Sequence, residues 1–392
     1  MAFRSLFIIL SVRLCLTDCE AKPRALSIKY GAGKPQAFRT ESGKAAKIEF
    51  SQLYQEGKIV NKMSEGTLLL RRGQVSTLLT IDECIDAVEL AFKSFAQGKT
   101  ANPGILGIHS TSGGFHIKAA IMELPRRYFV SKINANFPEN PHRFQLPTIQ
   151  GVIVLFDAEN GRPLAVMDSM EITVIRTGAA TAVAAKYLAR ADAKIITICG
   201  CGNQGEISLR AVNRVRNLER AFAFDKDSGK AENFSQRLST ELPFEVLPVK
   251  DLRAAVRESD ICVTGTPSKR FFIKREFVSP GAFIAAVGAD NEEKQEIDPT
   301  LMAAARVVVD HLQQCLTIGD LHHAVVQGLM TGKDVLAELG EVIAGLKPGR
   351  QSDNEILIFD STGTALQDVA AAGIVYERAV RNCIGTVVDF SR

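Results

Sequence analysis

The feature that most constrains the fold is a glycine-rich stretch in the middle of the chain, KIITICGCGNQGEISLRAV at residues 194–212. An apolar run typical of a strand ends at Cys199, and glycines follow at Gly200, Gly202 and Gly205. A helix-like pattern begins directly behind them. This order of strand, glycine loop and helix predicts a dinucleotide-binding turn within a parallel sheet.

Each glycine has a physical role in such a turn. Gly200 permits the tight turn, Gly202 lets the backbone approach a pyrophosphate, and Gly205 lets the helix pack closely on the strand. The helix N-terminus then faces the phosphates. The alternative is a purely structural turn, and the context weighs against it because a second apolar run ends in an acid, Asp225, at the expected spacing.

Asp225 also indicates which dinucleotide is bound. Its carboxylate would accept hydrogen bonds from the adenosine ribose hydroxyls and repel a 2′-phosphate. This favours NAD over NADP, and Lys226 beside it leaves NADP as the less favoured alternative.

Strand and helix patterns alternate from residue 195 to residue 310, which predicts βαβ units and a doubly wound parallel sheet. Two of the predicted strands lie within residues 259–268 and 285–297, and each ends in a loop, the first rich in small residues and the second with Gly288 and Asp290. Both loops would lie at the carboxyl edge of the sheet, where ligands of such folds bind. Asp290 in the second loop is a candidate acid or base, and the alternative is a solvated loop aspartate.

The chain before this region predicts a different kind of sheet. A capped amphipathic helix is expected over residues 80–98. Short β-like segments follow, separated by Pro, Asn and Gly turns, and predict an antiparallel or mixed sheet; they span residues 114–122, 128–137, 148–157 and 163–169. An alanine-rich helix then begins near Ile172. Beyond Leu312 we expect helices, a strand and a long final helix that return to this first domain.

Composition excludes several classes of function. The net charge of +3 comes from 47 basic and 44 acidic residues that are interspersed, so nucleic acid is not an expected partner. The eight cysteines show no CxxC pair and no metal-type spacing, which predicts reduced thiols in a cytoplasm and no metal. An apolar run at residues 3–16 is too short to span a membrane. We expect residues 1–62 to be a poorly ordered, dispensable extension and the folded body to begin at Met63.

Three blocks of sequence resemble one family. LPTIQGVIVLFDAENGRPLAVMDSMEITVIRTGAATAVAAKYLARADAKIITICGCGNQGE, at residues 146–206, resembles the most distinctive part of the ornithine cyclodeaminase/mu-crystallin family. AVGAD, which ends at Asp290, and GRQSDNEILIFDSTGTALQD, at residues 349–368, are similar to its later motifs. The resemblance runs in order from about Met63 to the C-terminus.

The resemblance implies a fold and a chemistry. The fold is an α/β homodimer with a Rossmann-type doubly wound parallel sheet, residues 181–311, inserted into an α+β substrate-binding and dimerisation domain, residues 63–180 and 312–392. The shared chemistry is hydride exchange between nicotinamide and Cα of a small amino or imino acid. Ornithine cyclodeaminase, which forms proline and ammonia, is the leading expectation. The alternatives are an amino-acid dehydrogenase or cyclic ketimine reductase, and a non-catalytic, crystallin-like nucleotide-binding protein.

The resemblance also implies roles for individual residues. Lys132 matches the active-site lysine, and a lysine within an apolar strand is costly unless it is paired. Arg176 matches the arginine that binds the substrate α-carboxylate, with a surface ion pair as the alternative. Asp290 matches the acid or base near the amine. The expected cofactor contacts beyond the glycines and Asp225 are Thr177, Asn203, Gln204, Thr266 and Val287.

The chain departs from the family pattern at two places. Gly104 stands where many members carry an arginine, and HIKAA, residues 116–120, stands where they carry a Met-Pro pair. We expect Lys118 to supply the cation that the missing arginine does not, which puts ornithine itself in doubt as the substrate. His116 would share a strand face with Lys118, and a structural histidine is the favoured interpretation there.

Overall fold

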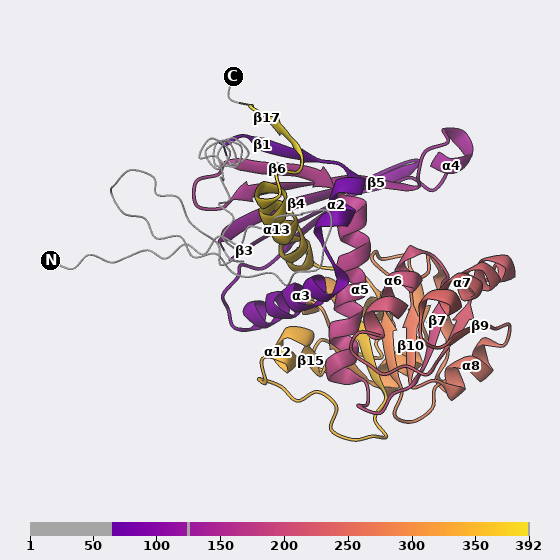
Figure 1. Cartoon of the computed structure of the whole chain (residues 1–392). Helices are drawn as coiled ribbons and strands as arrows, with labels where there is room; N and C mark the ends of the chain where they lie inside the picture. The colour runs from indigo at the N-terminus through magenta and orange to yellow at the C-terminus, as the bar shows by residue number, and fades with distance from the viewer. Residues whose placement is uncertain (1–64, 124–125, 391–392) are drawn as a thin grey trace, which may run out of the picture. The chain divides into compact units, whose positions relative to one another are not determined.

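The computed structural model describes residues 65–123 and 126–390 (Figure 1). The expected N-terminal extension and the start at Met63 lie outside these residues. The described part contains two large sheets, one mixed and one parallel. Of the helices in these ranges, none has the length and apolar character to cross a membrane.

The first sheet has seven strands in the order β17-β1-β6-β5-β4-β3-β2. Every neighbouring pair is antiparallel except β1 and β6, which confirms the predicted mixed sheet. The strands are β1 (Thr67–Leu70), β2 (Gly104–Ser110), β3 (Gly113–Glu123), β4 (Arg127–Asn136), β5 (Ile149–Asp157), β6 (Pro163–Asp168) and β17 (Thr386–Val388). The register of β3 and β4 places Lys118 directly opposite Lys132.

Helices cover one face of this sheet. The helices that contact its strands are α2 (Arg72–Leu78), α5 (Ser169–Leu188) and α13 (Ala365–Arg381), and α3 (Ile81–Ala96) packs on α5 and α13. The short α4 (Asn140–Arg143) follows β4 and precedes β5 along the chain. The predicted helix start near residue 80 is confirmed, because Thr80 caps α3 in a capping box with Glu83. Helix α13 packs on β3 and β4, so it faces the two strands that carry Lys118 and Lys132.

The second sheet has eight parallel strands in the order β15-β14-β16-β12-β10-β7-β8-β9, which confirms the predicted fold class. Its strands are β7 (Ile195–Cys199), β8 (Arg220–Phe224), β9 (Glu245–Pro248), β10 (Ile261–Thr264), β12 (Phe283–Ala286), β14 (Arg306–Val309), β15 (Ala337–Glu338) and β16 (Leu357–Asp360). The strand order reverses between β7 and β10, which is where dinucleotides bind in such sheets.

The remaining elements connect these strands. The helices are α6 (Asn203–Val212), α7 (Ser228–Glu241), α8 (Leu252–Glu258), η1 (Arg275–Phe277), α9 (Pro299–Ala304), α10 (Leu312–Cys315), α11 (Asp320–Val326) and α12 (Leu339–Ile343). A small parallel pair is formed by β11 (Lys269–Ile273) and β13 (Gln295–Ile297).

One expectation about the C-terminal part is wrong. We expected everything beyond Leu312 to return to the first domain, but β16 pairs between β12 and β14 inside the parallel sheet, and β15 extends its edge. Strand β16 is fully buried, and its short apolar run fits a central strand of a parallel sheet, which is covered on both faces. Helix α13 and β17 do return to the first sheet, as expected. The rest of the division at residues 181 and 311 stays a prediction.

Candidate active site

Lys132 lies in a buried ion pair. Strand β4 points its side chain toward α13, where Nζ lies 2.9 Å from Oδ1 and 2.8 Å from Oδ2 of Asp368. The side chains are 3% and 0% exposed. Burial, and then the charge of Arg176, lower the pKa of Lys132 to about 7, although Asp368 acts in the opposite direction. A buried lysine with such a pKa can take up and release a proton near neutral pH.

Arg176 shares the same carboxylate. It lies on α5, with Nε 3.2 Å from Oδ1 of Asp368, and one of its terminal nitrogens donates to Oε1 of Gln367 at 2.5 Å. The surface ion pair considered as the alternative is therefore wrong, because Arg176 is buried. Helix α13 thus holds two cations from two different elements through two consecutive residues.

Lys118 is the third buried cation of the cluster. Its Nζ donates to the carbonyl oxygens of Thr362 and Gly363 at 2.8 and 2.7 Å. Both contacts are to uncharged carbonyl groups, so neither is an ion pair. Burial, followed by Arg176, lowers the pKa of Lys118.

Gly363 brings Lys118 and Arg176 to one point. Its φ is +75°, and a Cβ there would lie 2.7 Å from a terminal nitrogen of Arg176. The backbone therefore approaches the guanidinium closely because this residue is glycine. Two further polar atoms nearby, Thr364 Oγ1 and Gln367 Nε2, are buried and have no hydrogen-bond partner among the described residues. Unpaired buried donors of this kind are available to a polar ligand.

Asp290 lies on the loop after β12, outside the buried cluster. Its side chain is 53% exposed, and Oδ1 accepts from Lys294 Nζ at 2.7 Å. Desolvation acts to raise the pKa of Asp290, but Lys294, Lys118 and His116 outweigh it and lower that pKa to about 2. Asp290 is therefore a carboxylate at neutral pH.

The glycine loop has the geometry expected from the sequence. Gly200 has φ +99°, and a Cβ there would lie 2.8 Å from the carbonyl oxygen of Gly265. A Cβ on Gly205 would lie 2.0 Å from the carbonyl oxygen of Gly200, so close packing requires glycine at this position. At Gly202, the N-cap of α6, an added Cβ would meet nothing within 4 Å. The space in front of the helix N-terminus is thus open, which fits a pyrophosphate.

Asp225 fixes the loop from the end of β8. Its Oδ2 accepts the backbone N–H of Cys201 at 2.9 Å, and Oδ1 accepts that of Asp227. A pocket of about 330 Å³ lies beside it, lined by Cys201, Asp227, Gly229, Lys230, Asn233, Phe234 and Arg237. Its place next to the glycine loop and Asp225 fits the adenosine end of a dinucleotide.

The other expected cofactor residues have mixed placements. Gln204 has a buried Oε1 without a partner in the described structure, whereas Asn203 begins α6 and is exposed. Thr266 lies against Gly200, with Cγ2 2.9 Å from the Cβ position of that glycine. Its hydroxyl donates to Glu296, and the Thr177 hydroxyl donates to Thr173 within α5. Val287 is buried, and its backbone N–H donates to Thr264. The roles of these residues stay predictions.

A helix contact joins Arg176 to the glycine loop. Gly178, two residues after Arg176 on α5, faces α6, and a Cβ there would lie 2.7 Å from Cγ1 of Ile207. Helix α6 is the helix that begins at the glycine loop. The close approach of α5 and α6 therefore places Arg176 near the expected cofactor.

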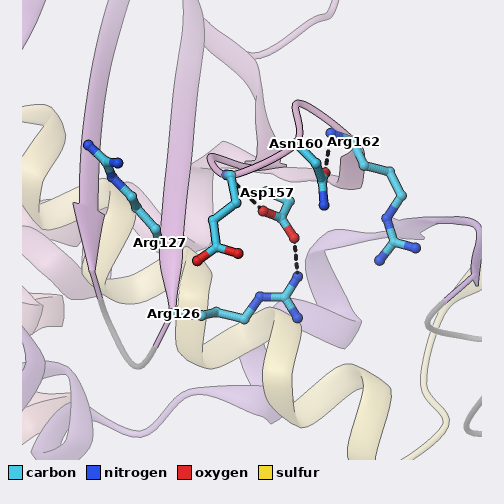
Figure 2. A pocket seen from close by; sticks show the side chains of 6 residues that line it. Arg126, Arg127, Asp157, Asn160 and Arg162 are labelled. Carbon is cyan, nitrogen blue, oxygen red and sulfur yellow. Dashed lines mark hydrogen bonds and ion pairs between the residues drawn. The ribbon is translucent and has the colours of Figure 1, made fainter.

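One surface pocket lies apart from these residues (Figure 2). It has a volume of about 450 Å³ and is lined by Arg126, Arg127, Asp157, Glu159, Asn160 and Arg162. It lies where β4 begins and β5 ends, and Arg126 pairs with Asp157 at 2.8 Å inside it. None of the residues predicted from sequence lines this pocket.

Sequence reasoning missed Gln367 and Asp368 in the cluster, and Asp310, which accepts the backbone N–H of Gly363. The signal for Asp368 was present, because an acid inside the apolar pattern of ALQDVAAAGIVY is costly to bury without a cationic partner. Gln367 and Asp310 carry no such signal, since their contacts depend on the position of β16 and the loop after it.

Comparison with known proteins agrees with the fold and the site. The sequence model of the ornithine cyclodeaminase/mu-crystallin family matches residues 65–382. An archaeal alanine dehydrogenase, solved as a dimer with bound NAD, is 39% identical, covers 83% of this chain and 99% of its own, and has a TM-score of 0.79. The Δ1-pyrroline-2-carboxylate reductase of Thermococcus litoralis, solved with NADH and L-proline, is 33% identical with a TM-score of 0.78 and covers 82% and 100%.

A less similar solved structure is that of a cyclodeaminase. A lysine cyclodeaminase that recognises L-lysine, L-ornithine and L-2,4-diaminobutyric acid is 27% identical, covers 83% of this chain and 96% of its own, and has a TM-score of 0.72. The neighbours solved with NAD or NADH agree with the cofactor predicted from Asp225 and the glycine loop.

Proposed function

Because the chain belongs to the ornithine cyclodeaminase/mu-crystallin family, we propose that it is an NAD-dependent enzyme that exchanges hydride with Cα of a small amino or imino acid. The observation that carries the proposal is the buried cluster of Lys118, Lys132 and Arg176, in which Lys132 and Arg176 share the carboxylate of Asp368 and Lys118 donates to backbone carbonyl oxygens. Asp368 pairs directly with two of these three groups and not with Lys118, so the cluster can accept an anionic ligand. The α-carboxylate of an amino acid is such a ligand.

Lys118 and Arg176 bind that carboxylate in this proposal. Both reach Gly363, so they can hold one anion from two sides, and the planar guanidinium suits a carboxylate. Thr364 and Gln367 add two unpaired polar groups at the same place. The expectation that Lys118 substitutes for the missing arginine is thus supported by its contact with the Gly363 backbone.

Lys132 transfers the proton. When an amino acid is oxidised to its imine, the nitrogen loses a proton while Cα loses a hydride. A neutral Lys132 can accept that proton and return it in the reverse direction, because its pKa of about 7 is close to the working pH. Asp290 is exposed, and with a pKa of about 2 it is an ionised carboxylate at neutral pH, so Lys132 is the better matched group for proton transfer.

The residues at the switch point would hold NAD, which would accept the hydride in oxidation and, as NADH, give it in reduction. Gly200, Gly202 and Gly205 would form its pyrophosphate site and Asp225 its ribose site. NADP stays the less favoured alternative, because the Asp225 carboxylate would repel a 2′-phosphate.

We favour a reaction with net oxidation or reduction over cyclodeamination. The more similar of the solved relatives are a dehydrogenase and a cyclic imine reductase, and the cyclodeaminase is more distant. The second candidate is cyclodeamination of a diamino acid such as ornithine, which that third relative supports. A purely crystallin-like role is disfavoured, because a buried polar cluster of this size is costly for stability and has no purpose in a structural protein.

A homodimer is part of the proposal. The open face of the seven-stranded sheet carries exposed apolar side chains that the register places together: Leu69, Leu106, Ile108, Phe115, Ile133 and Val152. A continuous apolar patch of this kind is typical of a subunit interface. The cysteines in the described ranges are all free thiols, which supports a reducing compartment such as the cytoplasm.

The test is an assay of the purified protein with NAD and a panel of alanine, proline and ornithine, following NADH, ammonia and proline together. Steady NADH formation with alanine or proline supports the favoured reaction. Ammonia and proline from ornithine without net NADH would select the cyclodeaminase instead. NAD binding without turnover of any amino or imino acid would refute the enzymatic proposal.

A further inference from the structure

A second buried acid lies behind the substrate cations. Asp310 follows β14 at the carboxyl edge of the parallel sheet and is fully buried. Its Oδ2 accepts the backbone N–H of Gly363 at 2.7 Å and the Ser361 hydroxyl at 3.1 Å. Its Oδ1 accepts the Thr362 hydroxyl at 3.2 Å and the Cys315 thiol at 3.3 Å. Three of these four donors belong to the segment Ser361–Gly363.

That segment is also the one that Lys118 contacts. The carbonyl oxygens of Thr362 and Gly363 accept from Lys118 Nζ, while the N–H and hydroxyl groups of the segment point to Asp310. The segment therefore lies between a carboxylate on one side and an ammonium on the other. Gly363 also lies against the Arg176 guanidinium, so its position affects both cations.

We propose that Asp310 is a positioning residue: it holds the Ser361–Gly363 segment in place and thereby fixes Lys118 and Arg176 for substrate carboxylate binding. The inference rests on the proposed function for its catalytic consequence. Its structural part, the fixing of Lys118, does not depend on which reaction the protein performs.

The arrangement has a chemical reason. Peptide groups that accept from a cation and donate to an anion are polarised in the same direction by both, which strengthens each hydrogen bond. A carboxylate is needed at residue 310 because it offers enough acceptor sites for four donors, whereas an amide offers one oxygen. An asparagine there would leave buried donors unpaired or oppose them with its own N–H groups.

Asp310 also acts on Lys118 through charge. The charged groups that act on Lys118 from the surrounding elements are Arg176, Asp290, Asp368, Asp310 and Lys132. The three acids raise the pKa of Lys118, against the larger lowering by burial and Arg176. Removal of the Asp310 charge therefore lowers that pKa further, so Lys118 loses its proton at a lower pH.

The experiment measures Lys118 directly. The full-length protein and its Asp310→Asn variant are pulsed with an amine-acetylating reagent, and acetylation of Lys118 is quantified by peptide mass spectrometry against exposed Lys186. We expect at least a fivefold faster acetylation of Lys118 in the variant. The control is Asp260→Asn, an acid at the start of β10 that pairs with Arg190 at 2.7 Å and has no contact with the Ser361–Gly363 segment among the interactions of the described residues. It should leave the Lys118 rate within twofold.

The kinetic arm uses whichever substrate the wild type turns over. Asp310→Asn should raise KM about tenfold with a smaller change in kcat, and the alkaline limb of kcat/KM should move to lower pH. A general loss of stability would not move that limb. If Asp310→Asn does not fold, Ser361→Ala with Thr362→Val removes two donors more mildly and should show the same changes at smaller size.

The outcomes separate the two proposals. Folded Asp310→Asn protein with an unchanged Lys118 acetylation rate overturns the positioning role, whatever the activity. A wild type without turnover refutes the proposed function, while the acetylation arm still decides whether Asp310 holds Lys118.

Discussion

Asp368→Asn is the sharpest test of the buried cation cluster. The substitution keeps the shape of the side chain and removes the charge that faces both Lys132 and Arg176. Removal of one partner from a buried ion pair costs about 3 to 5 kcal/mol, because a charge is left without compensation. Lys132 can become neutral at little cost, since its pKa is already about 7, so only Arg176 is left uncompensated. We therefore expect a loss near the lower end, about 3 kcal/mol.

The same variant makes a prediction for pH dependence. Asp368 raises the pKa of Lys132, so its loss lowers that pKa below about 7. A base must be neutral to accept a proton, and its kcat/KM falls on the acid side of its pKa. The acid limb for amino-acid oxidation should therefore move to lower pH. The assays are chemical denaturation and kcat/KM from acid to neutral pH.

Asp260→Asn is the control for this experiment. Asp260 pairs with Arg190 at 2.7 Å at the start of the parallel sheet, away from the cluster. It should lower stability and leave the shape of the pH profile unchanged. If Asp368→Asn is as stable as the wild type and its acid limb stays in place, the buried pair does not control Lys132 and the reasoning is refuted.

Three further predictions concern other parts of the molecule. Lys132→Met should abolish turnover and retain NAD binding, as measured by calorimetry. Because the pKa of Lys132 falls from 10.5 to about 7 on folding, the stability of the wild type relative to the variant should rise between pH 7 and 10.5. Asp225→Ser should raise KM for NAD about tenfold, or about 1.4 kcal/mol, and improve the use of NADP. An unchanged ratio of kcat/KM with NAD to kcat/KM with NADP would contradict the assignment of Asp225 to the ribose. Ile133→Lys should convert the proposed homodimer to a monomer, as measured by light scattering, whereas Arg214→Ala on another surface should not.

The parallel sheet was predictable because its pattern is local. Each βα unit carries its own apolar run, turn and helix, and the glycine loop needs only neighbouring residues to be recognised. Lys132 was recognisable for a similar reason, since a lysine within an apolar strand is locally conspicuous.

The rest depends on contacts between distant segments. Strand β16 lies between β12 and β14, although the chain reaches it last, and no local pattern reports where a late strand inserts. The position of Lys118 follows from the same insertion, because the segment after β16 supplies its two acceptors. The Asp290–Lys294 pair depends on the fold of an irregular loop in the same way.

The contact between α5 and α6 has a consequence for motion. At Gly178 the two helices approach so closely that even a methyl group would meet Ile207. A hinge at this point would have to break packed backbone, so Arg176 and the glycine loop should move as one body. If opening between Arg176 and the glycine loop limited the rate, turnover would slow in a more viscous solvent. Because the two move as one body, we expect turnover not to depend on solvent viscosity.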